Sequence, residues 1–209
     1  MSTAPAKKSA ARLAREAAYR TVVVDAAERV FADKGYDGAK IKDVADEAGI
    51  ALGTVYTLYP SKHDVFVAVH LQRGTALLER VMAAIETLDA PFDALERALH
   101  AACAFYAEHP AYLRMHLQRG DSWASPGKDA EEEAAIFGSA VAPLVALFTS
   151  AAERGELVDE RPETCARLLL TSMQVLLGEW VDEGFASPRE RVAERIVRHA
   201  RRSFERRRA

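Results

Sequence analysis

Several features that define other classes of protein are scarce or missing in this sequence of 209 residues. Two cysteines, Cys103 and Cys165, are too few for a disulfide-rich secreted domain, and 11 glycines are too few for a collagen-like chain. Runs of about 18 apolar residues are missing, which excludes a membrane-spanning helix. The basic start of the chain lacks the apolar middle of a signal peptide. We therefore expect a cytoplasmic chain with two buried free thiols.

The motifs of common enzymes and metal proteins are missing as well. Gly127 and Lys128 precede Asp129, so they form no phosphate-binding loop, and the sequence has no nucleophile elbow. The six histidines are scattered, and no Cys-x-x-Cys pair accompanies them. The sequence thus predicts no enzyme, no cofactor and no metal site.

Charge is segregated along the chain, although the net charge is only −3. Residues 1–62 carry 10 basic and 8 acidic residues, and residues 189–209 carry 9 basic and 3 acidic residues. The 126 residues between them carry 9 basic and 20 acidic residues. A partner that binds one end of the molecule is therefore plausible. The basic side chains of the C-terminal helix are expected to face solvent beside the acidic middle part of the chain.

Apolar residues recur with helical spacing in almost every long segment, which predicts an all-α fold of about nine helices. Glycine and proline punctuate the pattern, and Gly35 is expected to end the first long helix. The expected helices cover about residues 16–34, 41–48, 52–58, 62–88, 91–108, 110–118, 128–155, 162–184 and 188–206. The expected domains are a flexible basic tail over 1–15, a three-helix domain over 16–62 and a larger helical domain over 63–209.

The stretch from Lys40 to Lys62 predicts two short helices joined by a sharp turn at Gly49. Helices this short are unstable alone, so their apolar stripes must pack against the preceding helix. The stripes comprise Val44, Ala45, Ala48, Ile50, Val55 and Tyr59. This arrangement is a helix-turn-helix, whose second helix can enter the DNA major groove.

The residues that the second short helix leaves outside are small or carry hydroxyls, which suit phosphate oxygens and base edges. They are Leu52, Gly53, Thr54, Tyr56 and Thr57. Lys62 begins the next helix, where its charge favours a phosphate, and Lys40 and Lys42 could grip the DNA backbone in the same way. Tyr56 could instead pack inward, Thr54 could satisfy its own backbone, and the two lysines could form a solvated face.

Residues 19–70 resemble the N-terminal domain of the TetR family of transcriptional regulators. The matching residues are Ala26, Ala27, Phe31, Gly35, Tyr36, Asp43, Ala45, Ala48, Gly49, Gly53, Thr54, Tyr56, Tyr59, Ser61 and Lys62. The resemblance implies a homodimer that binds operator DNA and that a small molecule releases. It maps Thr54, Tyr56 and Lys62 to phosphate contacts, and Leu52, Gly53 and Thr57 to the groove.

This sequence departs from the family pattern at both helix starts of the motif. Lys40 and Ala51 stand where the family often has Thr and Ser, which cap helices, and each lost cap costs about 1 kcal/mol. The N-terminal lysines and arginines form either a plain tail or an arm that reaches a minor groove. They are Lys7, Lys8, Arg12, Arg15 and Arg20.

The last two helices carry apolar stripes that could build a four-helix interface between two subunits, or could only close the core of one chain. We expect the dimer. Its predicted interface residues are Leu169, Met173, Leu176, Leu177, Val192, Ile196, Ala200 and Phe204.

The remaining helices of the second domain are expected to surround an effector cavity. Each candidate lining residue fits ordinary core better than ligand contact, and His100 and His116 could equally be satisfied core histidines or half-exposed. The candidates are His70, His100, Tyr106, Tyr112, His116, Trp123, Phe137, Met173, Gln174 and Trp180. The segment 120–127 could gate this cavity.

The function predicted from the sequence is a dimeric, ligand-responsive DNA-binding regulator, most often a repressor. Its partners are double-stranded operator DNA, a second copy of the chain and a small-molecule effector, with no membrane. A helical protein-interaction module whose first helices only resemble a DNA reader is the alternative, and a helical enzyme comes last.

Overall fold

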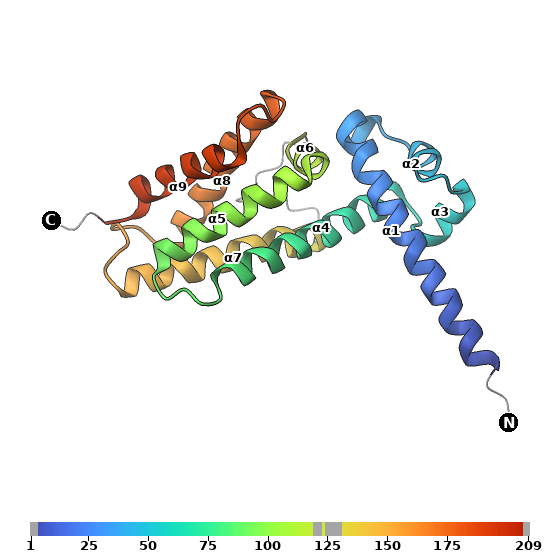
Figure 1. Ribbon diagram of the computed structural model, residues 1–209, viewed down its shortest axis with the longest axis horizontal. Helices are drawn as coiled ribbons and strands as arrows, with labels where there is room; N and C mark the ends of the chain where they lie inside the picture. Colours follow the sequence, from blue (N-terminus) through green and yellow to red (C-terminus); the bar gives the residue numbers. More distant parts are fainter. Residues whose placement is uncertain (1–3, 119–122, 124–130, 207–209) are drawn as a thin grey trace. The chain divides into compact units, whose positions relative to one another are not determined.

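The computed structural model describes residues 4–118, 123 and 131–206, with side chains for 11–118, 123 and 141–206. These residues form nine α-helices and one isolated bridge between Leu157 and Glu205, which confirms the all-α fold (Figure 1). The backbone divides into two compact units, residues 1–72 and 73–209. Within the described part of the chain, no helix has the length and apolar character needed to cross a bilayer.

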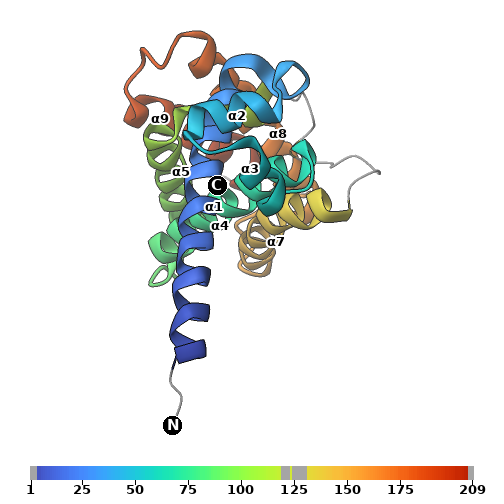
Figure 2. The same ribbon diagram turned by 90° about the vertical axis from the view of Figure 1, so that its right-hand side faces the viewer.

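The first unit contains α1 (Ala4–Gly38), α2 (Ile41–Ala48), α3 (Leu52–Leu58) and the beginning of α4 (Lys62–Ile85). Helix α1 packs against both short helices (Figure 2). Positive φ angles of 70° at Gly35 and 64° at Gly49 break the chain where glycine was expected to do so. This confirms the predicted helix-turn-helix geometry.

The core of this unit is aromatic and aliphatic. Phe31 is fully buried, and its ring lies 5.6 Å from Phe66 and 5.8 Å from Tyr36, centroid to centroid. Val44 and Val55 from the two short helices are also fully buried. The short helices are therefore held by the tertiary core and not by their own propensity.

Helix α1 begins at Ala4, whereas the sequence analysis placed its start near Glu16 and expected a frayed tail before it. The apolar stripe begins only near Val23, but the preceding residues are rich in alanine, the strongest helix former. Helical propensity therefore extends the helix beyond the residues that pack. Arg12 and Arg15 are exposed on this extension, and the side chains of Lys7 and Lys8 lie outside the described ones.

The second unit contains the rest of α4 with α5 (Pro91–Glu108), α6 (Pro110–Gln118), α7 (Glu131–Glu153), α8 (Pro162–Asp182) and α9 (Arg189–Phe204). Helix α5 packs against α9 and α7, and α8 packs against α7 and α9 (Figure 1). As expected, basic residues of α9 meet the acidic body: Arg201 lies 2.8 Å from Asp93 and 2.9 Å from Glu96.

Helices α8 and α9 bury the residues that were predicted to form a subunit interface. Seven of them are at most 7 % exposed within the single chain, and Leu176 is half-buried. These side chains close the core of the second unit, because the apolar stripes of α8 and α9 face the other helices of the same chain. The subunit interface itself stays a prediction. The exposed large apolar side chains of α8 in the single chain are Leu168, at 51 %, and Val175, at 59 %.

Candidate functional site

Helix α3 divides its residues cleanly between core and surface. Val55 and Leu58 are buried, whereas Leu52 is 39 % and Tyr56 is 49 % exposed. Gly53 and Thr57 are exposed beside them, and Thr54 is half-buried. The structure therefore brings the predicted groove-facing residues together on one surface, and Tyr56 does not pack inward.

Gly53 has no steric reason to be glycine within the described part of the protein. A Cβ built there meets no atom within 4 Å, and its φ is not positive. The neighbouring hydroxyl of Thr57 donates a 2.8 Å hydrogen bond to the carbonyl of Gly53. Its oxygen lone pairs and methyl group remain on the exposed surface, where they suit a base edge.

The two lysines that were predicted to contact the DNA backbone lie at the start of α2. Lys40 is exposed, and its backbone N–H donates to the Asp43 carboxylate at 2.8 Å. This contact, together with the 2.8 Å ion pair of Lys34 with Asp43, lowers the pKa of the Asp43 carboxyl, Lys34 being the larger cause. Lys42 is exposed and pairs with Asp46 at 2.6 Å. The Asp43 carboxylate thus satisfies the backbone N–H of Lys40, while Lys40 makes no side-chain cap hydrogen bond to α2.

Lys62, which was predicted to contact a phosphate, has protein acceptors in the single chain. Its ammonium group donates to the carbonyls of Tyr36 at 2.7 Å and Ala39 at 3.1 Å, and it lies 4.4 Å from the centre of the Tyr36 ring. These carbonyls belong to the turn between α1 and α2. The cation therefore binds protein acceptors and stabilises that turn.

Arg20 makes a similar contact at the end of α3. Its guanidinium donates to the carbonyl of Leu58 at 3.1 Å and lies 5.1 Å from the centre of the Tyr59 ring. It also pairs with Glu16, which is the largest cause of its raised pKa. Arg20 thus joins α1 to the C-terminus of α3 and is not part of a loose arm.

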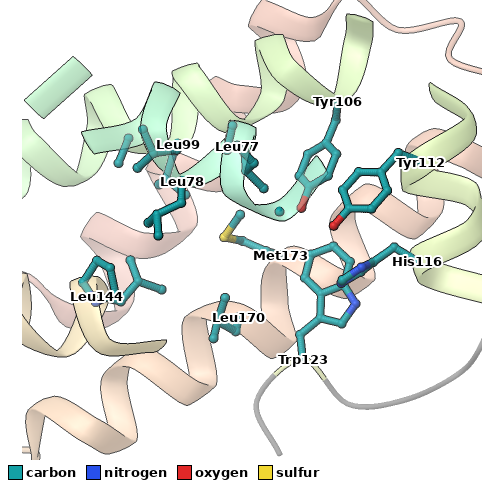
Figure 3. Close-up of a pocket in the computed structure, with 15 residues that line it drawn as sticks. Leu77, Leu78, Leu99, Tyr106, Tyr112, His116, Trp123, Leu144, Leu170 and Met173 are labelled. Carbon is teal, nitrogen blue, oxygen red and sulfur yellow. The ribbon is translucent and has the colours of Figure 1, made fainter. Parts of the chain in front are cut away.

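The second unit encloses a cavity of about 140 Å³ between five helices (Figure 3). Five of the ten predicted ligand-binding residues line it: Tyr106, Tyr112, His116, Trp123 and Met173. The apolar wall includes residues that the sequence analysis did not single out. They are Gly74, Leu77, Leu78, Val81, Ala98, Leu99, Ala102, Pro143, Leu144 and Leu170.

The other predicted ligand-binding residues do not line this cavity among the described side chains. His70 is buried in the first unit, 4.4 Å from the Phe66 ring, and His100 is half-buried on α5. Trp180 donates its indole N–H to the carbonyl of Ser187 at 2.9 Å. Gln174 contacts a lining residue, because its side-chain oxygen accepts a hydrogen bond from the backbone N–H of Trp123 at 3.2 Å. The Phe137 side chain and, apart from Trp123, the segment 120–127 lie outside the described parts.

The polar side chains of the cavity are uncharged at neutral pH. Burial lowers the pKa of His116 to about 3 and raises the pKa of Tyr106 well above its usual value. Elsewhere in the unit, both cysteines are buried free thiols, as predicted, and burial raises the pKa of Cys103 to about 12. The described residues bring together no group of three or more potential metal ligands.

The helical fold and the exposed surface of α3 define a helix-turn-helix regulator of transcription. Residues 23–69 match the family model described as bacterial regulatory proteins, tetR family. The chain therefore carries an N-terminal domain of the tetR family of bacterial regulatory proteins. A similar curated protein is the HTH-type transcriptional repressor BepR of Brucella suis biovar 1, which is 26 % identical over 82 % of this chain and 86 % of its own length.

Solved structures share this fold over most of the chain. A tetR-family regulatory protein from Rhodococcus RHA1 is 25 % identical, with a TM-score of 0.73, over 88 % of this chain and 95 % of its own. The regulator FadR of Bacillus subtilis, solved in complex with stearoyl-CoA, is 16 % identical, with a TM-score of 0.74, over 86 % of this chain and 96 % of its own.

Proposed function

We propose that this protein is a homodimeric, sequence-specific repressor that a small molecule releases from its operator DNA. The observation that carries the proposal is the surface of α3, where Leu52, Gly53, Tyr56 and Thr57 are exposed while Val55 and Leu58 of the same helix are buried. The similarity to the repressor BepR favours repression. Such a protein acts in the cytoplasm, at the nucleoid when bound to DNA, and has no catalytic role.

In the proposed complex, α3 lies in the major groove. Gly53 allows the helix backbone to approach the bases, and the exposed Thr57 and Leu52 contact base edges and thymine methyl groups. Thr54 and the exposed hydroxyl of Tyr56 bind phosphate oxygens. Glycine costs a helix up to about 1 kcal/mol relative to alanine, so its presence at an uncrowded position favours a role in binding.

Lys40 and Lys42 are the proposed cationic contacts to the DNA backbone, because both are exposed at the start of α2. Lys42 must exchange its exposed partner Asp46 for a phosphate, which costs little at the surface. Lys62 and Arg20 have a different proposed role. They hold the ends of α1 and α3 at fixed positions and thereby orient the recognition helix.

The proposed dimer uses the outer face of α8. Leu168 and Val175 lie seven residues apart, which is two helical turns, so they share one face of the helix. Each is more than half exposed in the single chain. A two-fold axis through this face would bury both side chains twice. The resulting dimer would carry two copies of α3, one for each half-site.

The proposed effector site is the cavity of the second unit, and α4 is the proposed route of coupling. Residues 74, 77, 78 and 81 of α4 line the cavity, and residues 62–72 of the same helix belong to the DNA-binding unit. A ligand that binds better when α4 is displaced would favour a spacing of the two α3 helices that does not match the operator.

The DNA-binding proposal is tested with a duplex selected by the full-length protein from a random pool, followed by fluorescence anisotropy over a range of salt concentrations. Lys40→Ala should lower the slope of log affinity against log salt by about 0.9 for each subunit, because one phosphate contact is lost. Tyr56→Phe should weaken binding roughly fivefold at an unchanged slope, since it removes one uncharged hydrogen bond. Enrichment of no sequence from the pool would favour a protein-interaction module instead.

The dimer is tested by sedimentation. Leu168→Glu with Val175→Glu should yield monomers, because it places charges on the proposed apolar interface. Met82→Glu, on an exposed residue of α4, is the control and should leave the dimer intact. A stable dimer of the double variant would assign the interface to another surface.

A further inference from the structure

One end of the cavity is polar, although its walls are aliphatic. The rings of Tyr106 and Tyr112 are stacked with centroids 6.3 Å apart, and the His116 ring lies 4.5 Å from the Trp123 ring. Figure 3 shows both tyrosine hydroxyls pointing toward the same part of the cavity, beside Trp123 and opposite the leucines. The cavity therefore has an apolar part and a hydrogen-bonding part.

Each polar group at this end can donate a hydrogen bond, and the indole of Trp123 can only donate. The indole N–H of Trp123 is buried and has no acceptor among the described residues. An indole nitrogen only donates, and a buried donor without an acceptor is unfavourable. A ligand oxygen that reaches the edge of Trp123 beside the His116 ring would accept that N–H, and the tyrosine hydroxyls can donate further hydrogen bonds.

The charge of the lining favours an uncharged ligand. Its described side chains are apolar, phenolic, indole or imidazole groups, with no Asp, Glu, Lys or Arg among them. Burial of an ion without a partner of opposite charge is strongly unfavourable. An uncharged oxygen such as a carbonyl or ether satisfies the donors without that cost.

The size of the cavity favours a single ring. An engineered protein cavity of about 150 Å³ with aliphatic and aromatic walls binds benzene. The cavity here is about 140 Å³ and has walls of the same kind. A long acyl chain, such as that of the stearoyl-CoA bound to the similar Bacillus subtilis FadR, would require a larger space.

We propose that the cavity binds an uncharged molecule of one ring that carries a hydrogen-bond-accepting oxygen. The ring lies against Leu99, Leu170 and Met173, and the oxygen accepts hydrogen bonds from Trp123 and the tyrosine hydroxyls. This inference rests on the proposed function and deepens it, because it names the chemical class of effector for the same cavity.

The test compares four probes by isothermal titration calorimetry with the full-length protein. Acetophenone has one ring and a neutral carbonyl, toluene lacks the oxygen, benzoate is charged, and stearoyl-CoA carries a long chain. Acetophenone should bind roughly fivefold or more tightly than toluene. It should also bind more tightly than benzoate and stearoyl-CoA. Tighter binding of benzoate or stearoyl-CoA, or equal binding of acetophenone and toluene, overturns the proposed class.

Two tryptophan variants test the polar end. Trp123→Phe keeps an aromatic ring but removes the N–H, so it should reduce the preference for acetophenone over toluene and leave toluene binding unchanged. Trp180→Phe is the matched control, because its N–H donates to Ser187 away from the cavity. It should leave the preference intact. An unchanged preference in Trp123→Phe would refute the role of this donor.

Fluorescence anisotropy of the selected duplex, measured with each probe present, distinguishes a failure of the proposed ligand class from a failure of the proposed function. Acetophenone that binds the protein without weakening DNA binding supports the class and contradicts the effector role of the cavity. Release of DNA by benzoate or stearoyl-CoA, with no binding of acetophenone, supports the effector role and overturns the class.

Discussion

The two units differ in how their candidate binding residues relate to their cores. On α3, the residues proposed to contact DNA point away from the core, as the 49 % exposure of Tyr56 shows. In the second unit, the cavity is lined by core side chains, since Leu170 is 6 % and Tyr112 is 2 % exposed. Binding and stability should therefore be separable in the first unit and inseparable in the second.

Lys62 and Arg20 are the exceptions within the first unit. They are cations near the proposed DNA surface, yet both donate to protein acceptors: Lys62 to backbone carbonyls, and Arg20 to one carbonyl and to Glu16. A positive charge in a DNA-binding unit is thus not in itself evidence of a phosphate contact. Substitutions that separate stability from binding distinguish the two roles.

The largest effect is expected at the cavity wall. Leu170→Ala should lower the free energy of unfolding by about 2–5 kcal/mol and also change the affinity for acetophenone, because one side chain serves both core and site. Urea denaturation and calorimetry measure the two effects. Met82→Ala, at a residue 45 % exposed, is the control and should stay within about 0.5 kcal/mol. A stability loss without a change in affinity would show that Leu170 belongs to the core but not to the binding site.

The second effect concerns Lys62. Lys62→Met keeps a long side chain but leaves the turn carbonyls without their donor, so the free energy of unfolding should fall by about 1–3 kcal/mol. The slope of log DNA affinity against log salt should stay unchanged. A slope lower by about 0.9 per subunit at unchanged stability would restore Lys62 as a phosphate contact.

The third effect is a pH dependence that originates in the cavity. Burial lowers the pKa of His116 to about 3 from 6.5, so below pH 6.5 the unfolded chain binds a proton that the folded chain does not. Stability should therefore fall with acidification, by about 1.4 kcal/mol between neutral pH and pH 5.5. Its ring neighbours Tyr112 and Trp123 are uncharged in this range.

The variant His116→Gln isolates this contribution. Urea denaturation of both proteins at pH 7 and pH 5.5 measures it, and contributions from other groups cancel in the difference. The variant should lose less stability than the parent on acidification. Equal losses would show that His116 is protonated equally in both states.

The smallest effect on stability is expected at Gly53. Gly53→Ala should raise the free energy of unfolding by about 0.5–1 kcal/mol, because the added Cβ meets nothing within 4 Å and alanine favours the helix. The same methyl group should weaken DNA binding by obstructing the approach of α3. Gly38→Ala, whose Cβ would lie 3.9 Å from that of Lys34, is the control and should leave DNA affinity unchanged. Normal DNA affinity of Gly53→Ala would show that the backbone does not approach the DNA there.

Local patterns in the sequence predicted the secondary structure well where packing and propensity agree. The bounds of α2 and α3 follow from apolar spacing and from the turn at Gly49, and the end of the regular part of α1 follows from Gly35. The start of α1 was missed because alanine-rich residues extend the helix beyond its apolar stripe. Helix formation depends mainly on residues that are close in sequence, so it could be predicted without the structure.

Contacts between residues that are distant in sequence could not be predicted in the same way. The ammonium of Lys62 reaches the carbonyl of Tyr36, 26 positions earlier, and a lysine that begins a helix looks identical in sequence whether it binds phosphate or carbonyl oxygen. On α8, the spacing predicted an apolar face but not its direction. Leu169 and Leu177 face the core, whereas Leu168 and Val175 face outward.

The sequence by itself determined that this is an all-helical regulator with a helix-turn-helix near its N-terminus, because helix formation and the glycine breaks are local properties of the chain. Only the tertiary structure decided which side chains meet. It bound Lys62 and Arg20 to backbone carbonyls, and it selected Leu77, Leu99 and Leu170 from many similar leucines to enclose a cavity. A leucine in a cavity wall and a leucine in a filled core obey the same pattern, and they differ only in whether other helices fill the adjacent space.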